Sequence, residues 1–541
     1  MKAQQILIPK KLRYLFVFLL LSSAVIGDFH QSIRAAASAQ QSSQNSPSGV
    51  VLKRTTRAVV LDVVVTDKTG HSVPGLTKTE FTLLEDGQPQ TIATFEAAGI
   101  SHRIDDPQRT ISALGSEFPQ IILLIDEMNT SFKDLAYARY CMGKLLRKNG
   151  GQLQQSTALM ALTNEGLRVL HGSTLDSNTL WAALDHHHPA IPWRLKGGVY
   201  GASERLNISL GALEKIAAAG EGSSIRRSVV WISPGLPILS SISITAESQA
   251  NALSAIRKLS DELLHARVTV YTVDPRGVRE SSALSTISSA SPGTFNASYW
   301  EVLSQSNNSN FGDLALQRFA IETGGKSFWG HNSIDGEVAS SISEGEAYYT
   351  FSYYPSNSLF DGKFRKIAVA MNRPELKSRT RDGYFAIPEA PPPTDEQLTD
   401  QIELALSNPL GYLGVPVTAK ASVLPGEPQQ IRVAITADRH SLTWNTLSNG
   451  GQQCQLIAVA ATFSSASNEK PLKIQKEDFA YVLPAERMSA LAEKPVIYTL
   501  SLPFEPGIAH MRILLRDKVS GRTGTVDLRG PFSQGATAAR P

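Results

Sequence analysis

A repeated alternation of apolar strands and amphipathic helices is the feature that most constrains how this chain folds. From Pro119 onward, continuous apolar runs rich in β-branched residues alternate with segments whose apolar residues recur at helical spacing. The predicted strands include FPQIILLIDEM, SVVWISPG and VTVYTVDPRG, and the predicted helices include DLAYARYCMGKLLRK, LNISLGALEKIAAAG and SQANALSAIRKLSDELLHA. Because such strands need cover on both faces, the pattern predicts an α/β fold with a doubly wound, mostly parallel sheet.

Changes of pattern divide the 541 residues into several domains. The α/β domain is expected at 118–352, with a Ser/Asn-rich insertion near 279–310. Before it, alternating sequence predicts a small β domain at 57–98, in which Gly87 supplies the positive φ of a tight hairpin turn after Asp86. After it we expect a β extension at 353–388, a Pro-rich linker at 389–400, an immunoglobulin-like β-sandwich at 401–531 and a disordered tail at 532–541.

The first 39 residues have the layout of a signal peptide. Basic residues precede the apolar run Tyr14–Gly27, and Ala37-Ser38-Ala39 offers small residues for cleavage. The run is shorter than the roughly 18 to 20 residues that cross a bilayer as a helix. We therefore expect export to the periplasm, the cell surface or the medium, with a flexible tether at 40–56. The long spacing between the run and the small residues leaves an uncleaved membrane anchor as the alternative.

Composition excludes several classes of partner and site. Hydrophobic residues make up 42% and charged residues 19% of the chain, which is typical of a globular protein. A net charge of +3 creates no strong field, and no basic run is interleaved with aromatic residues in the expected mature region, so nucleic acid is not an expected partner. The two cysteines, Cys141 and Cys454, fall in different predicted domains, which favours buried thiols over a disulfide.

The order of the motifs resembles a von Willebrand factor A-related family found in exported proteins of Acidobacteria and related soil bacteria. The stretches that carry the resemblance are LDVVVTDKTGHSVPGLTKTEFTLLEDGQPQTIATFE, PQIILLIDEMNTS, VTVYTVDPRG, ETGGKSF, AYYTFSYYP and KFRKIAVAMNRPELKSRTRDGYFA, which together span about 51–386. The resemblance implies a central A-like domain flanked by β domains. It says less about function, because such families are defined mainly by sequence and fold.

The A-like fold also implies a metal-ion-dependent adhesion site at the carboxyl ends of the strands. In such sites a D-x-S-x-S loop and two further loops place oxygens on Mg²⁺. Asp126 and Thr130 align with the first loop, but Met128 replaces its first serine, and a thioether is a poor ligand for a hard cation. Ser203 and Ser233 stand where a Thr and an Asp are expected, with Tyr200 as the alternative to Ser203.

These departures imply that the metal site is degenerate. We therefore expect no cofactor, with Mg²⁺ or another divalent cation as the alternative. Glu127 and Asn129 are the substitute oxygens that the same loop offers. The alternative for Asp126 is a structural one, in which its side chain caps the start of the following helix.

Other motifs have simpler interpretations. Ala320–Ser327 misses the first glycine of a phosphate-binding loop and follows a predicted helix, so we expect no nucleotide partner and interpret Gly324-Gly325 as a helix stop. The run His186–His188 is interpreted as polar loop residues, because consecutive side chains point in different directions. Asp274 is interpreted as the opener of an Asp-Pro turn.

Three aromatic residues, Trp193, Tyr200 and Trp300, lie in irregular segments, where they serve either as contact anchors or as core residues. No metalloprotease, paired C-x-x-C or G-x-S-x-G motif occurs. The leading hypothesis is therefore an exported, non-enzymatic binding or scaffold protein that recognises a protein partner. The alternatives are an envelope enzyme with an accessory A domain and a purely structural component of the envelope.

Overall fold

The computed structural model describes most of the chain beyond residue 56. The described residues are 57–97, 120–148, 151–189, 198–223, 226–235, 246–277, 319–344, 348–388, 391–424, 429–464, 470–487, 494–505, 507–530 and 532. The predicted signal peptide or anchor (1–39), the tether (40–56), the insertion near 279–310 and nearly all of the tail lie outside this set, as do Trp193 and Trp300. Within it, no helix is long and apolar enough to cross a membrane.

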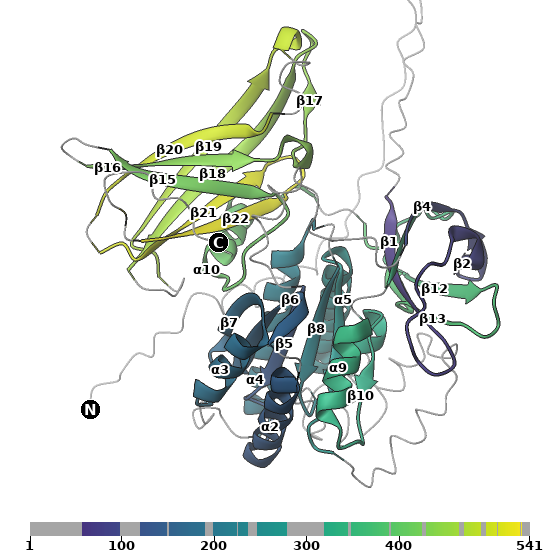
Figure 1. The fold of residues 1–541 in the computed structure, drawn as a ribbon. Helices are drawn as coiled ribbons and strands as arrows, with labels where there is room; N and C mark the ends of the chain where they lie inside the picture. Colours follow the sequence, from purple (N-terminus) through teal and green to yellow (C-terminus); the bar gives the residue numbers. More distant parts are fainter. Residues whose placement is uncertain are drawn as a thin grey trace, which may run out of the picture. The chain divides into compact units, whose positions relative to one another are not determined.

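A six-stranded mixed sheet forms the centre of the α/β domain (Figure 1). The strand order is β10-β9-β8-β5-β6-β7, and every pair is parallel except the edge hairpin of β6 and β7. The bounds are β5 (Ile121–Asp126), β6 (Gln152–Thr163), β7 (Gly166–Asp176), β8 (Arg227–Ile232), β9 (Val268–Val273) and β10 (Ser327–Phe328). The predicted mostly parallel α/β sheet is thus confirmed.

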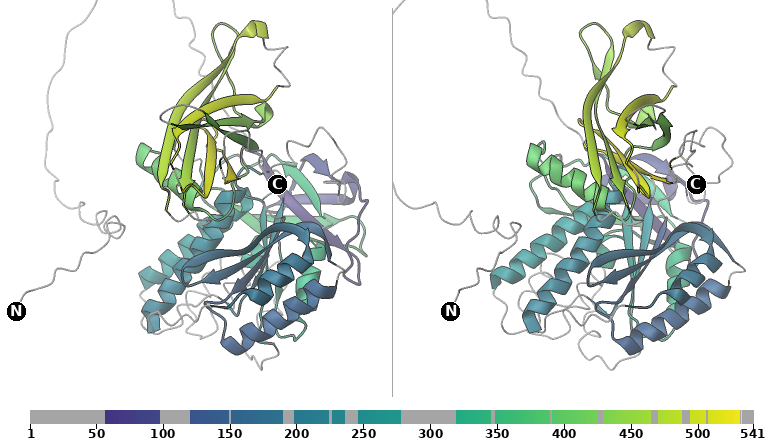
Figure 2. Two further views of the ribbon diagram at one scale, coloured as in Figure 1. Left: turned by 60° about the vertical axis from the view of Figure 1, so that its left-hand side comes forward. Right: turned by 90° about the vertical axis from the view of Figure 1, so that its left-hand side faces the viewer.

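Helices cover both faces of this sheet (Figures 1 and 2). They are α2 (Phe132–Lys148), α3 (Ser177–His186) and α9 (Ile334–Glu344) on one face and α4 (Gly198–Gly220) and α5 (Ala246–His265) on the other. β5 is buried along its whole length, and its alternate residues serve the two faces: Leu123 packs with α2, α3 and α9, and Leu124 packs with α4 and α5. This double burial explains the continuous apolar run in the sequence.

The strands before and after the α/β domain pair with one another. β1 (Val59–Thr66), β2 (Phe81–Glu85), β3 (Gln88–Gln90) and β4 (Ile92–Glu96) come before it, with a short 3-10 helix, η2 (Lys78–Glu80), between β1 and β2. β11 (Tyr349–Tyr353), β12 (Phe364–Met371), β13 (Lys377–Arg379) and β14 (Gly383–Phe385) come after it. They form two sheets, β13-β1-β11-β4 and β14-β12-β2-β3, around one apolar core.

The segments expected as a separate small β domain and a β extension are therefore one unit, which we call the split β unit. The α/β domain is inserted between β4 and β11. In each of the two sheets, either half supplies only two strands, and a two-stranded piece is at best marginally stable by itself, which is the physical reason for the long-range pairing.

Two predicted glycine features are confirmed. Asp86 and Gly87 have φ values of 48° and 79°, as the tight turn between β2 and β3 requires. Gly324 has φ +81°, and the amide of Gly325 donates to the Ala320 carbonyl (2.8 Å), which ends a helical turn.

A helix occupies part of the predicted Pro-rich linker. α10 (Asp395–Ser407) begins with a capping box, in which the hydroxyl of Thr394 accepts from the amide of Gln397 and the Gln397 side chain accepts from the amide of Thr394. Leu406 of α10 is buried in the same apolar cluster as Leu213 of α4 and Val459 of the C-terminal strands. This segment packs against its neighbours, which the Pro-rich run before it did not indicate.

The C-terminal strands form two antiparallel sheets with a shared apolar core. One sheet contains β15 (Val417–Leu424), β16 (Gln430–Ala437) and β20 (Val496–Pro503). The other contains β17 (Asn445–Thr446), β18 (Gln452–Phe463), β21 (His510–Asp517) and β22 (Thr523–Arg529), with β19 (Lys473–Leu483) also paired to β18. Two 3-10 helices, η4 (Arg439–Ser441) and η5 (Ala485–Arg487), lie between strands. We call this part the C-terminal β region. Cys141 and Cys454 are buried free thiols, as expected.

Candidate functional site

A buried polar network surrounds Asp126, the last residue of β5. One oxygen of its carboxylate accepts from the backbone amide of Asn129 (2.8 Å), and the other accepts from the Asn129 side-chain amide (2.8 Å) and the Ser233 hydroxyl (2.7 Å). Asp126 has no exposed surface and Ser233 is 1% exposed. The network thus joins the loop after β5 to the end of β8.

Asp126 does not cap helix α2. That role belongs to Ser131, whose hydroxyl accepts from the amide of Asp134 (3.3 Å) and donates to its carboxylate (2.6 Å). Asp126 instead fixes the loop between the strand and the helix, with help from the Leu162 carbonyl, which accepts from the amides of Glu127 (3.0 Å) and Met128 (3.2 Å).

Burial raises the pKa of Asp126 from its ordinary value of 3.8 to about 6. The hydrogen bonds from Asn129 and Ser233 act in the opposite direction, because they stabilise the ionised carboxylate. Desolvation is the larger effect, so the negative charge is costly at this position.

The four residues predicted for a metal site are only partly brought together. Asp126 and Ser233 are hydrogen-bonded, and Thr130 is 9% exposed with its hydroxyl lacking a hydrogen-bond partner among the described residues. Ser203 lies half-buried on α4, whereas Ser209, farther along the same helix, receives a hydrogen bond from the Asn129 side chain (3.3 Å). Ser209 was missed because its position relative to β5 depends on how α4 packs.

This donor set does not fit a Mg²⁺ site. The cation would need several oxygens in near-octahedral geometry, but both oxygens of Asp126 already accept from N–H and O–H donors. The Met128 side chain, which replaces the first hydroxyl ligand, is buried among apolar side chains. Within the described ranges, no three His, Cys, Asp or Glu side chains are grouped so that they could hold a metal ion.

A second buried pair lies beside this network. A ring nitrogen of His187 (Nε2) lies 2.5 Å from Oε1 of Glu127, and the two side chains are 7% and 1% exposed. Arg139 of α2 donates to the carbonyls of Leu184 (2.6 Å) and His187 (2.7 Å), and so holds the end of α3 in place. His187 lies in the loop after α3, as predicted, but its side chain is buried against Glu127, and His186 is the last residue of α3. The sequence carries no local signal for this contact, since 60 positions separate the two partners.

Asp274, at the end of β9, has the predicted role in a turn. Its carboxylate accepts from the amide of Arg276 (2.9 Å) and pairs with the guanidinium of the same residue (2.6 Å). Nearby, burial raises the pKa of Glu337 to about 7, and the Asp274 carboxylate contributes to this shift. Lys326 acts in the opposite direction, and His331, which lies 3.2 Å from Glu337, is 70% exposed.

Contacts with both β parts lie at the opposite, amino edge of the sheet. Arg267, which immediately precedes β9, donates to Thr350 of the split β unit (2.9 Å) and pairs with Asp62. At the end of α4, the carbonyl of Ala219 accepts from the amide of Leu413 (3.3 Å), which leads into the C-terminal β region. The polar residues around Asp126 therefore lie at the sheet edge away from these contacts.

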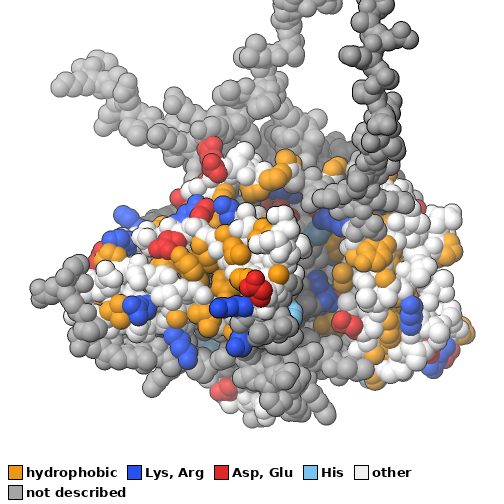
Figure 3. All heavy atoms as spheres, turned by 90° about the horizontal axis from the view of Figure 1, so that it is seen from above, with side chains coloured by type: hydrophobic (Ala, Val, Ile, Leu, Met, Phe, Trp, Pro, Cys, Tyr) orange, Lys and Arg blue, Asp and Glu red, His pale blue; other side chains and the backbone are white. Residues whose placement is uncertain are grey.

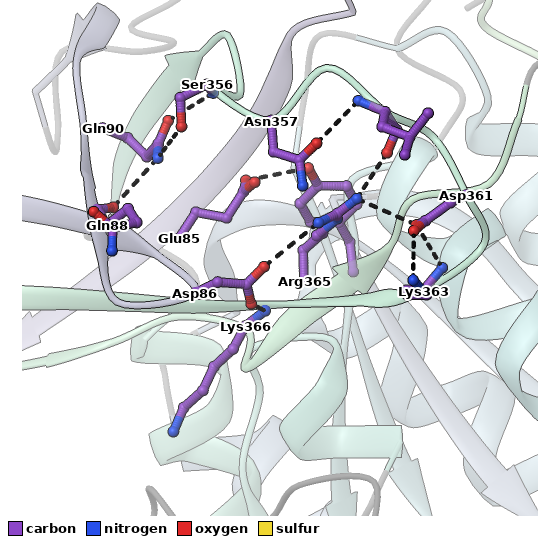
Figure 4. Close-up of polar contacts among 12 residues, drawn as sticks. Glu85, Asp86, Gln88, Gln90, Ser356, Asn357, Asp361, Lys363, Arg365 and Lys366 are labelled. Atoms are coloured by element: carbon purple, nitrogen blue, oxygen red, sulfur yellow. Dashed lines mark hydrogen bonds and ion pairs between the residues drawn. The ribbon is translucent and has the colours of Figure 1, made fainter.

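A separate polar cluster lies within the split β unit (Figure 4). Arg365 donates to the carboxylate of Asp361 (3.2 Å) and lies 3.7 Å from Asp86. The buried carboxylate of Glu85 accepts from the hydroxyls of Tyr353 (2.6 Å) and Tyr384 (3.1 Å). These contacts join β2 to the strands that follow the α/β domain, so the cluster has a structural role.

Comparisons with known proteins do not assign the chain to a family. No protein-family model matches the chain, and no curated protein matches it. Among solved structures, the chain is similar to a von Willebrand factor type A protein from Catenulispora acidiphila. The two are 10% identical with a TM-score of 0.23, over 88% of this chain and 75% of that chain. The mixed sheet with its antiparallel edge strand is itself consistent with a von Willebrand A-like fold.

Proposed function

We propose that the chain is an exported bacterial binding or scaffold protein whose A-like domain holds a protein partner at the carboxyl edge of its sheet. The observation that carries the proposal is the distribution of contacts. Both β parts contact the amino edge, through Arg267 and Ala219, while the polar network of Asp126 lies at the other edge. In open α/β sheets, ligands bind beyond the carboxyl ends of the strands.

The binding proposed here is independent of a cation. In place of a metal, the amide of Asn129 and the hydroxyl of Ser233 stabilise the Asp126 carboxylate and fix the loop that a metal would otherwise organise. Millimolar Mg²⁺ should leave the melting temperature of the protein unchanged relative to EDTA. A clear rise with Mg²⁺ that disappears in Asp126→Ala would restore the adhesion-site hypothesis.

The buried Glu127–His187 pair does not favour the enzyme alternative. A general acid–base pair must reach the proton that it transfers, and these side chains are 1% and 7% exposed. Their contact joins the loop after β5 to the end of α3, which is a structural task.

Site-specific photo-crosslinking tests the proposed face. A photoreactive residue replaces Ser131 or Glu165, which are exposed at the carboxyl edge, or Gln152, which is exposed at the start of β6 near the amino edge. With envelope extract of the source bacterium, we expect a defined crosslinked protein from the first two positions and none from Gln152. Crosslinks from Gln152 alone, or from none of the three, would contradict the proposal.

Export is tested separately by expressing the whole chain in a Gram-negative host. We expect a periplasmic product that begins after Ala39, because the small residues end there. A full-length product in the membrane fraction would instead support the anchor.

A further inference from the structure

Helix α2 exposes three aromatic side chains on its outward face. Phe132 is 81% exposed, Tyr140 is 64% exposed and Tyr137 is 40% exposed. At about 100° per residue, these positions fall within roughly 140° of the helix circumference. We call this surface the aromatic face of α2, and it comprises Phe132, Lys133, Ala136, Tyr137, Tyr140 and Lys144.

The aromatic face begins at the carboxyl edge of the sheet. Phe132 directly follows Ser131, the residue that caps α2, and the helix lies between α3 and α9 (Figure 1). The hydroxyl of Tyr137 donates to the carbonyl of Asn332 (2.8 Å), so this ring is held in one orientation. Phe132 is therefore placed where the proposed partner would approach.

The charged residues of the aromatic face itself are basic. Lys133 is exposed near Phe132, and Arg147 lies over the ring of Trp181 (4.5 Å) in the last turn of the helix. Lys144 is paired with Asp335 of α9 (2.8 Å). The one acidic residue of α2, Asp134, accepts a hydrogen bond from the capping serine. The start of a helix also attracts negative charge, so the complementary surface is anionic and apolar.

We propose that the aromatic face of α2 binds an acidic amphipathic helix of the partner protein. Apolar residues of that helix cover Phe132 and Tyr140, and its carboxylates lie toward Lys133 and Arg147. A helix is the favoured occupant because α2 offers side-chain ridges, while its own backbone groups are already used within the helix. This inference rests on the proposed function and specifies the chemistry of its partner.

Charge argues against two other occupants. A second copy of the chain, packed face to face, would bring Lys133 and Arg147 of one protomer toward the same basic residues of the other. An anionic membrane is recognised by larger basic clusters, and Lys144 is already neutralised by Asp335. Exposed apolar side chains also occur on the surface in Figure 3, but residues of both charge signs are interspersed there.

The test uses the exported chain and a displayed library of random peptides of about 16 residues, long enough for roughly four helical turns. We expect the enriched peptides to combine Asp or Glu with apolar residues spaced three and four apart. Their affinity should fall about tenfold or more in the double variant Phe132→Ser/Tyr140→Ser. It should also fall in Lys133→Glu.

Ile497→Ser is the matched control, because Ile497 is 57% exposed on β20, in the C-terminal β region. It should leave binding unchanged. Since the substituted side chains are exposed, the variants should retain the circular dichroism spectrum and melting temperature of the parent protein.

Three outcomes would overturn the inference: enriched peptides that are basic, peptides that bind the double variant as tightly as the parent, or binding only to vesicles containing phosphatidylglycerol. If crosslinks form at Ser131 and Glu165 but the double variant forms them equally well, the proposed function stands and this inference fails. If acidic peptides bind α2 but no protein crosslinks at these positions, the proposed function fails on its own test.

Discussion

Replacing Ser233 with alanine tests whether Asp126 carries a buried negative charge. The substitution removes a 2.7 Å hydrogen bond to the carboxylate without adding bulk. A buried hydrogen bond to a charged group contributes about 2 kcal/mol, and one to a neutral group contributes about 1 kcal/mol. Because the pKa of Asp126 is about 6, Ser233→Ala should lower the free energy of unfolding by about 2 kcal/mol at pH 8 and about 1 kcal/mol at pH 5.

The sign follows from proton linkage. The pKa of Asp126 is raised in the folded protein, so the folded state binds the proton more tightly than the unfolded state, and stability falls as pH rises from about 4 to 6. Loss of the Ser233 donor raises this pKa further and deepens that fall.

Urea unfolding at the two pH values, followed by tryptophan fluorescence, measures the difference. Thr157→Val is the matched control, because the Thr157 hydroxyl is buried and donates to a neutral carbonyl, that of Gln155 (2.9 Å). Its effect should be equal at both pH values. An equal effect of Ser233→Ala at pH 5 and pH 8 would refute the charged network.

Three further predictions concern stability. Gly325→Ala should lower the melting temperature and reduce the free energy of unfolding by about 2 to 3 kcal/mol, because the new Cβ would lie 2.0 Å from the carbonyl oxygen of Val270. Gly172→Ala is the control and should have a much smaller effect, because no atom lies within 4 Å of the new Cβ there. His187→Ala should lower the free energy of unfolding in urea by about 3 kcal/mol, because it leaves Glu127 buried without its partner. Lys473→Ala, which breaks the exposed 3.7 Å pair with Glu505, should lower it by less than about 1 kcal/mol. Similar losses for the two variants would contradict the reasoning. Glu337→Gln should stabilise the protein at pH 8 by about 1 to 2 kcal/mol and not at pH 5. The reason is that the carboxyl of Glu337, with a pKa of about 7 in the folded protein, is ionised there only at the higher pH. A loss of stability at pH 8 would show that the buried charge is well compensated.

The sequence by itself determined the features that depend on short stretches of chain. Apolar periodicity over β5 and α2 predicts a strand and a helix, because each pattern reflects burial on faces set by local geometry. The turn at Asp86-Gly87 and the helix stop at Gly324-Gly325 follow from the positive φ that glycine adopts without strain. Asp126 was recognisable as a residue of the site because it directly follows the apolar run of its strand.

Only the tertiary structure decided which distant residues meet. The pairing of β1 with β11 crosses the whole inserted α/β domain, and strand pairing depends on backbone hydrogen bonds that any sequence can form. Likewise, Ser209 and His187 reach the loop of Asp126 through the packing of α4 and α3, for which the sequence offers no local pattern. Burial then raises the pKa of Asp126, because the cost of a charge depends on all the atoms that exclude water from it.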